Sequence, residues 1–329
     1  MPQSIVTPFW HPAQSGAFIL DWDGVLADTR LNFLPLRQKY FGGKTVPLIE
    51  AAASLPEPLS TEVKSEICRI EMEGAKKATA VEGAHDLITW LNENKKPWAV
   101  VSRNCRDSIL LAAEQSGIDL PLVVLSREDP HVKPAPEAMA LAAKKLKIDL
   151  ADCVMVGDFI YDLLGARRAA IRSVLVQRDG VEWANLADIA YPTVKEFVKS
   201  LSSPEPLVPW EYHDLVQERG TDYFTNVARR IYRMGNTATF SQALELARMG
   251  VIHLSVPNDL KIGIDDWKNS SLPAQTINMP LHVLLRDVMA AHWPCVEITA
   301  TSEDLDEKNI EVPLLYGEEL RDFILNSLQ

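Results

Sequence analysis

The chain has 329 residues, about twice the ~150 residues of an ordinary domain, so two folding units are expected. Hydrophobic residues make up 47% and charged residues 24%, a balance typical of globular proteins that excludes a disordered chain. The net charge of −12 argues against a broad face for nucleic-acid phosphates, so we expect no nucleic-acid partner.

Several features bear on where the protein resides. No apolar run approaches the roughly 18 residues of a membrane-spanning helix, so no transmembrane segment is expected. Residues 1–12 lack the basic start and long apolar stretch of a secretory signal peptide. The four cysteines lie far apart, which excludes a zinc finger and a dense disulfide framework. These features predict a cytoplasmic protein, and export by a specialised secretion system, which needs none of these marks, stays open.

Short apolar runs alternate with segments of helical periodicity from residue 17 to residue 201. The runs are too short for helices and lack polar alternation, so each suits a strand buried on both faces of a parallel sheet. They are AFIL (17–20), WAVV (98–101), LVVL (122–125), CVMV (153–156) and SVLV (173–176). The expected helices are at 82–94, 107–117, 136–147 and 161–170. This alternation predicts an α/β fold with a Rossmann-like, doubly wound parallel sheet.

One segment, at about residues 30–80, interrupts the alternation directly after the first strand. It contains no strand-like run and has the patterns of helices, so we expect a small helical cap inserted into the α/β core. The first domain is therefore expected to span residues 1–203.

A proline-rich segment, SSPEPLVP (202–209), is the expected linker. Beyond it, residues 204–329 mix helical patterns with the strand-like runs VIHLSV (251–256) and VEITAT (296–301). We therefore predict a separate C-terminal α+β domain. It matches no known motif, and its role stays open between binding a partner, mediating dimerisation and completing the cap as a lid.

Polar residues follow four of the apolar runs. In an open α/β sheet the ligand crevice lies beyond the carboxyl ends of the strands, so these residues are expected to meet at one edge. They are Asp21 and Asp23 after the first run, Ser102 and Arg103 after the second, Lys133 after the third, and Asp158 and Asp162 after the fourth.

Such a set suits a cation together with an anion. Carboxylates that lie close together repel one another, and Mg²⁺ removes this repulsion because it prefers oxygen ligands and keeps waters for a substrate phosphate. Lys133 and Ser102 suit the other side of a phosphoryl group, one as a charge and the other as a hydrogen-bond donor. The residues therefore predict a phosphoryl-transfer site that uses Mg²⁺.

The order and spacing of four stretches resemble the motifs of the haloacid dehalogenase superfamily. The stretches are DWDGVLADT (21–29), VVSRN (100–104), HVKPAPE (131–137) and VGDFIYD (156–162). Within about residues 15–200 the sequence looks most like phosphatases of the phosphoglycolate phosphatase type, which carry a helical cap where this chain has its insertion. The C-terminal region has no part in the resemblance.

The resemblance implies roles for the acidic residues. Asp21 would be the nucleophile that forms an aspartyl-phosphate, and Asp23 the general acid and base. Asp158, with the Asp21 side chain and the Asp23 carbonyl, would hold Mg²⁺. Asp162 would lie next to these ligands and support them without binding the ion itself.

The resemblance also implies that Ser102, Arg103 and Lys133 bind the phosphoryl group of a phosphorylated small molecule. The short cap leaves room for a phosphoprotein substrate instead. Val25 leaves open a phosphomutase of the β-phosphoglucomutase type, whereas Asp23 disfavours dehalogenases. A further alternative is a docking protein whose C-terminal domain binds a protein or membrane partner and directs the phosphatase core to a phosphoprotein.

Overall fold

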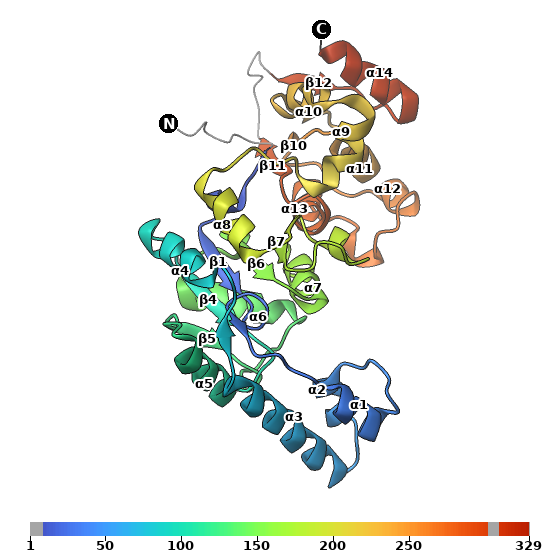
Figure 1. The fold of residues 1–329 in the computed structure, drawn as a ribbon. Helices are drawn as coiled ribbons and strands as arrows, with labels where there is room; N and C mark the ends of the chain where they lie inside the picture. Colours follow the sequence, from blue (N-terminus) through green and yellow to red (C-terminus); the bar gives the residue numbers. More distant parts are fainter. Residues whose placement is uncertain (1–8, 302–308, 329) are drawn as a thin grey trace. The chain divides into compact units, whose positions relative to one another are not determined.

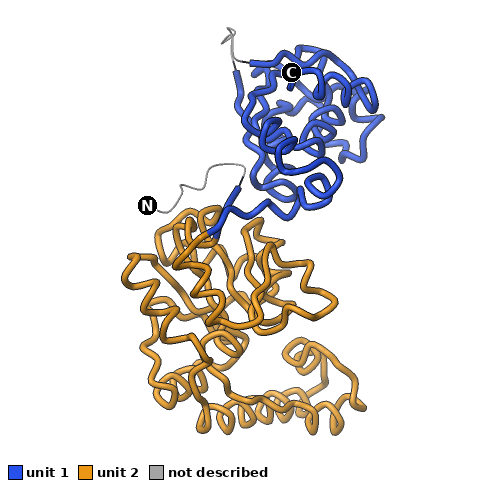
Figure 2. Tube along the Cα trace, turned by 45° about the horizontal axis from the view of Figure 1, so that its top comes forward, with its two compact units in different colours: residues 1–11, 205–329 blue, residues 12–204 orange. Residues whose placement is uncertain are grey.

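The computed structural model describes residues 9–301 and 309–328, which belong to two compact units (Figure 1, Figure 2). One unit is Pro12–Pro204, and the other joins Glu205–Gln329 to the N-terminal residues up to His11. The expectation about a signal peptide concerns residues 1–12, of which residues 1–8 lie outside the described residues. No helix of the described ranges is long and apolar enough to cross a membrane.

A six-stranded parallel sheet forms the centre of Pro12–Pro204 (Figure 1). Its strands are β1 (Ala17–Leu20), β4 (Trp98–Val101), β5 (Val123–Leu125), β6 (Cys153–Gly157), β7 (Arg172–Val176) and β8 (Ile189–Tyr191). Their order in the sheet is β5-β4-β1-β6-β7-β8, with every neighbouring pair parallel. This is a Rossmann-like order: the chain runs outward from β1 through β4 to β5, returns to β6 beside β1, and continues outward through β7 to β8. The predicted doubly wound α/β fold is therefore confirmed.

Helices cover both faces of this sheet. They are α4 (Ala84–Glu93), α5 (Arg106–Ser116), α6 (Pro136–Leu146), α7 (Ile160–Arg168) and α8 (Val194–Ser202). Successive side chains of a strand point to opposite faces, so Phe18 and Leu20 pack among residues of α4, α5 and α8, while Ile19 packs among residues of α6 and α7. Because helices cover both faces of the sheet, every residue of β1 is buried, and this explains why its apolar run has no polar residue.

The insertion after β1 is a cap of three helices. They are α1 (Leu34–Phe41), α2 (Leu48–Ala53) and α3 (Leu59–Ala75), and they share a small apolar cluster that includes Leu36, Ala52 and Val63. A short antiparallel ribbon of β2 (Ala27–Asp28) and β3 (Thr79–Ala80) joins the two ends of the insertion. The long helix α3 packs against α5, so the cap is held to the core along this helix (Figure 1).

The second unit contains a four-stranded sheet. Its strands are β9 (Ile231–Met234), β10 (His253–Pro257), β11 (Glu297–Thr301) and β12 (Ile310–Val312), in the order β11-β10-β9-β12. Its helices are α9 (His213–Arg219), α10 (Thr221–Ala228), α11 (Phe240–Arg248), α12 (Ile264–Lys268), α13 (Leu281–His292) and α14 (Gly317–Ser327). Short 3₁₀ helices in the chain are η1 (Pro12–Gln14), η2 (Leu150–Asp152), η3 (Ala184–Leu186), η4 (Trp210–Tyr212) and η5 (Ala274–Thr276).

All strand pairs of this second sheet are parallel, so the predicted α+β class of the C-terminal domain is wrong and the unit is α/β. The physical reason is that parallel neighbours need crossover connections, and α11 and α13 supply them here. The expectation missed β9, because its residues continued the helical pattern of α10. In the structure Tyr232 and Met234 are fully buried while Ile231 is exposed, the alternation of a strand.

Candidate active site

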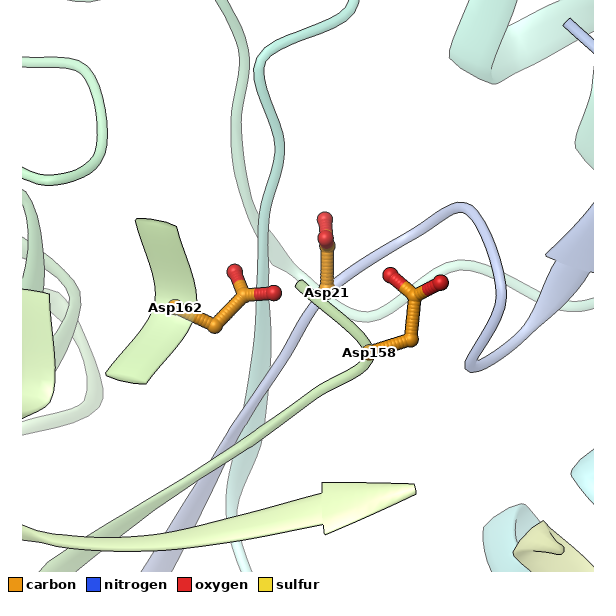
Figure 3. A group of neighbouring side chains, drawn as sticks. All are labelled: Asp21, Asp158 and Asp162. Carbon is orange, nitrogen blue, oxygen red and sulfur yellow. The ribbon is translucent and has the colours of Figure 1, made fainter. Parts of the chain in front are cut away.

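The carboxyl ends of β1 and β6 bring three aspartates together (Figure 3). Asp21 directly follows β1, Asp158 directly follows β6, and Asp162 lies in the first turn of α7. One carboxylate oxygen from each lies within 4.8 Å of the others. Figure 3 shows the three carboxyl groups gathered at one place although they come from a strand end, a loop and a helix.

Lys133 is the cation of this cluster. Its side chain is 1% exposed, and Nζ lies 2.6 Å from Asp21 Oδ1 and 2.6 Å from Asp162 Oδ1. Burial lowers the pKa of Lys133, but the charges of Asp162 and Asp21 outweigh burial, so the pKa is raised and the amine stays an ammonium. Lys133 therefore pairs with two of the three carboxyl groups, those of Asp21 and Asp162.

Arg178, in the loop after β7, contacts the cluster at Asp158. Its Nε donates a hydrogen bond of 3.0 Å to Asp158 Oδ2, and its guanidinium lies 5.4 Å from the ring centroid of Phe159. Burial, followed by repulsion from Asp21, raises the pKa of Asp158 to about 6 although Arg178 opposes the shift. Sequence reasoning missed Arg178, which carries the same signal as Ser102, a polar residue shortly after an apolar run.

The donor set of this cluster fits a hard divalent cation. Asp21 and Asp158 offer oxygen ligands, and a divalent ion relieves the repulsion between them. Glycine allows the loop after Asp21 to come close, since a Cβ on Gly24, whose φ is +73°, would lie 2.4 Å from Asp158 Cγ. The main chain at Gly24, next to Asp23, therefore lies directly against the Asp158 side chain.

Asp23 accepts hydrogen bonds on both carboxylate oxygens. The Thr29 hydroxyl donates to Oδ1, and the Asn104 side-chain amide donates to Oδ2. Burial raises the pKa of Asp23 to about 7, and repulsion from Asp21 adds to the shift while the two hydrogen bonds oppose it. A carboxyl group that titrates near neutral pH can give and take a proton under physiological conditions.

Asp23→Asn is expected to stabilise the metal-free protein at neutral pH. Because the pKa of Asp23 is about 7 in the folded state against 3.8 for the unperturbed group, the folded state holds the proton more tightly. Stability therefore falls as the pH rises from about 4 to about 7. Asparagine removes this dependence, so the variant should gain about 2–4 kcal/mol at pH 7 and gain little below pH 4.

Urea unfolding in the presence of EDTA, at pH 4 and at pH 7, measures the free energy of unfolding of the wild type and of Asp23→Asn. A gain of equal size at the two pH values would show that the titration of Asp23 is not its source.

The cluster lines a cavity of about 510 Å³ between the core and the cap. Ser102 and Asn104 lie on the core side of this cavity, and Phe33 and Ile49 on the cap side. Arg37 of α1 also lines the cavity. The cavity therefore joins the acidic cluster to the three-helix cap.

Ser102 and Arg103 both line this cavity, but they have different partners. Ser102 is 3% exposed, lines the cavity, and accepts a hydrogen bond of 3.1 Å from the Asn104 N–H. Arg103 donates to the Glu50 carboxylate of α2 over 3.0 and 2.8 Å and to the Lys133 carbonyl. Its guanidinium also lies 4.4 Å from the ring centroid of Tyr161. Arg103 therefore connects the cap to the core.

Known proteins resemble this chain over its first unit. Residues 16–170 match the family model of haloacid dehalogenase-like hydrolases. The pyrophosphatase PpaX of Halalkalibacterium halodurans is 25% identical over 175 residues, which cover 48% of this chain and 81% of that protein. The N-acetylmuramic acid 6-phosphate phosphatase of Pseudomonas putida is 26% identical over 184 residues, which cover 49% of this chain and 82% of that protein.

A solved structure of a hydrolase from Pseudomonas syringae has the same fold. It superimposes with a TM-score of 0.51 and 19% identity over 57% of this chain and 99% of that chain. The four sequence motifs all lie within the matched residues, whereas residues 205–329 lie outside the family match. Residues 16–170 of this chain, just under half of its length, are therefore similar to the haloacid dehalogenase-like hydrolases.

Proposed function

We propose that the protein is a Mg²⁺-dependent phosphatase that hydrolyses a phosphate monoester through a phosphoryl group carried on Asp21. The observation that carries this proposal is the convergence of Asp21, Asp158 and Asp162 around one cavity, with Lys133 buried between two of them. The two curated relatives are named as a pyrophosphatase and a sugar-phosphate phosphatase, which supports the same class of reaction here.

Asp21, Asp158 and the Asp23 main-chain carbonyl are the residues proposed to hold Mg²⁺. When bound there, the ion supplies positive charge that attracts a phosphate oxygen and stabilises the charge of the transition state. Asp162 is engaged by Lys133 at 2.6 Å and is proposed to fix that lysine beside the ion rather than to bind the ion.

In the first half of the reaction Asp21 is the nucleophile. One of its carboxylate oxygens attacks phosphorus, the bond from phosphorus to the leaving oxygen breaks, and the proton of Asp23 passes to that oxygen. The pKa of about 7 keeps protonated Asp23 available at neutral pH. Lys133 and the main-chain N–H of Trp22, which donates to Asp21 Oδ1 over 2.6 Å, hold the nucleophile in position.

In the second half Asp23 is the base. Its carboxylate accepts a proton from a water molecule, the oxygen of that water attacks phosphorus, and the bond from phosphorus to Asp21 breaks. Inorganic phosphate leaves, and both carboxyl groups return to their starting states. The hydrogen bonds from Thr29 and Asn104 favour the charged form of Asp23 during this half.

Ser102 and Lys133 are proposed to bind the transferring phosphoryl group. Both are buried side chains on the core wall of the cavity, one a hydroxyl donor and the other an ammonium. Buried donors of fixed position stabilise the charge of a phosphoryl group better than water does, because they need no reorganisation during the reaction. Residues 205–329 supply none of the groups in this mechanism, and partner binding or dimerisation by them stays a prediction.

Arg103 is proposed to position the cap through Glu50 rather than to bind phosphate. Glu50→Gln should then raise KM roughly 1.5- to fivefold, since a partly exposed ion pair contributes about 0.2–1 kcal/mol. Arg103→Ala should raise KM at least as much, because Arg103 also contacts the Lys133 carbonyl and the Tyr161 ring. The double variant should be no worse than the worse single variant, because both changes remove one interaction.

Steady-state kinetics on an aryl phosphate measure these effects. If Arg103 binds the phosphoryl group directly, Arg103→Ala will lower kcat/KM by about 10²-fold or more while Glu50→Gln leaves it unchanged.

The experiment that tests the proposed function is phosphate release from para-nitrophenyl phosphate. We expect inorganic phosphate to appear with Mg²⁺ present, to stop with EDTA and to resume when Mg²⁺ is restored. A panel of phosphorylated metabolites, sugars, nucleotides and phosphopeptides then separates a small-molecule substrate from a phosphoprotein. Interconversion of sugar phosphates without release of phosphate would instead identify a phosphomutase.

A further inference from the structure

Two cysteines from separate parts of the chain meet at the junction of the cap and the core. Cys68 lies on the cap helix α3, and Cys105 directly precedes the core helix α5. Their Sγ atoms are 3.5 Å apart, well beyond the roughly 2.05 Å of a disulfide bond, so both are thiols in this structure. A movement of about 1.5 Å would bring the two sulfurs to bonding distance.

The surroundings of the pair link it to the site. Cys105 follows the segment that carries Ser102 and Asn104, two residues of the cavity wall. Its main-chain N–H donates to Glu71 Oε2 over 3.1 Å, and Glu71 lies on α3 three positions after Cys68, on the same face of that helix. The two sulfurs therefore lie where α3 already contacts the core.

The two thiols differ in their access to a reagent. Cys105 is 4% exposed, and burial raises its pKa to about 11, which disfavours the reactive thiolate. Cys68 is only half-buried, so it is the more accessible of the two residues to an oxidant in solution. Cys105 is then positioned to attack the sulfur of a modified Cys68 from 3.5 Å away.

We propose that Cys68 and Cys105 are a redox modification site at which a low-molecular-weight disulfide, such as oxidised glutathione, converts the two thiols into an intramolecular disulfide. The Cys68 thiolate attacks the glutathione disulfide, forming a mixed disulfide and releasing one glutathione. The Cys105 sulfur then attacks the Cys68 sulfur, and the second glutathione leaves with the remaining proton. Two protein thiols and one oxidised glutathione thus give one protein disulfide and two reduced glutathiones.

The bond would fix α3 of the cap to the start of α5. The helices α1 and α2 pack on α3, so their freedom to move away from the cavity would decrease with it. Enzymes that enclose their substrate under a cap need that cap to open for entry and release. Oxidation should therefore slow turnover, and dithiothreitol should restore it; this consequence rests on the proposed phosphatase function.

Mass spectrometry of the full-length protein after incubation with oxidised glutathione tests the modification itself. We expect the wild type to lose two hydrogen atoms and to yield a cross-linked peptide pair that contains Cys68 and Cys105. Cys295→Ser, a matched substitution in the other unit, should form the same bond. Cys68→Ser should form no bond, and Cys105→Ser should retain one glutathione on Cys68.

The modification is overturned if the wild type keeps both residues as thiols, if it stays a mixed disulfide at Cys68, or if the bond joins other cysteines. If the reduced protein has no phosphatase activity, the proposed function is refuted, but the formation of the disulfide is still tested by its mass. If the bond forms in an active protein and turnover is unchanged, the effect on the cap is refuted.

Discussion

Asp21→Asn is expected to lower turnover of any phosphate monoester by about 10⁴-fold or more while the protein stays folded. The substitution keeps the size of the side chain but replaces the attacking carboxylate by an amide, which cannot form the phosphoryl intermediate. The substitution also removes one of the two carboxylates that pair with Lys133. The other, Asp162, stays 2.6 Å from the lysine, so the buried ammonium keeps a charged partner. Phosphate release under saturating Mg²⁺ measures the loss.

Asp28→Asn is the matched control for this prediction. Asp28 lines the same cavity, but its carboxylate pairs with Arg30 and has no place in the proposed mechanism. It should keep turnover within a few-fold of wild type, as expected for an exposed ion pair. An Asp21→Asn variant that retains turnover within tenfold of wild type would rule out Asp21 as the nucleophile.

Lys133→Met is expected to abolish turnover and also to destabilise the protein by about 3–5 kcal/mol. The lysine is 1% exposed and pairs with two carboxylates, so its removal leaves a cluster of three acids without its ammonium. Methionine retains most of the volume of the side chain, which separates the loss of charge from the creation of a cavity. Urea unfolding of the metal-free protein measures the change in stability.

A second substitution distinguishes charge from packing. Lys133→Met combined with Asp162→Asn removes one acid together with the lysine, so it should regain part of the lost stability. Turnover should stay abolished, because the phosphoryl group still lacks its buried cation. Equal stability of the wild type and Lys133→Met would contradict a paired, charged lysine in this cluster.

The fold of the unit Pro12–Pro204 could be predicted because most of its strands are unbroken apolar runs. A four-residue apolar run such as 17–20 or 98–101 is buried on both faces, and a parallel sheet covered by helices is the arrangement that buries it. The edge strand β8 (Ile189–Tyr191) was missed, because its three residues are only half-buried and leave no such run. In the second unit β9 was missed for a related reason, its short alternation following the helical pattern of α10 without a break.

The set of acids in the candidate site could be predicted, because the carboxyl ends of parallel strands lie at one edge of the sheet regardless of side-chain conformation. The pairings between individual side chains could not be predicted. Arg103 meets Glu50 across 53 positions of sequence, and the pairing depends on where the cap lies and on the rotamers of both residues. Arg178, by contrast, follows the fifth apolar run, 173–176, as Ser102 follows the second, so its place at the same edge is predictable from the sequence.

The proposal that a phosphoryl group is carried on Asp21 is tested most directly by trapping it. Borohydride reduces an aspartyl-phosphate to homoserine, so enzyme quenched during turnover of para-nitrophenyl phosphate can be reduced and its peptides sequenced by mass spectrometry. Asp23→Asn is the preferred variant, because it lacks the base of the second half and nitrophenolate leaves without an acid. We predict homoserine at position 21 that depends on Mg²⁺; homoserine at another position, or none while phosphate is released, would contradict the mechanism.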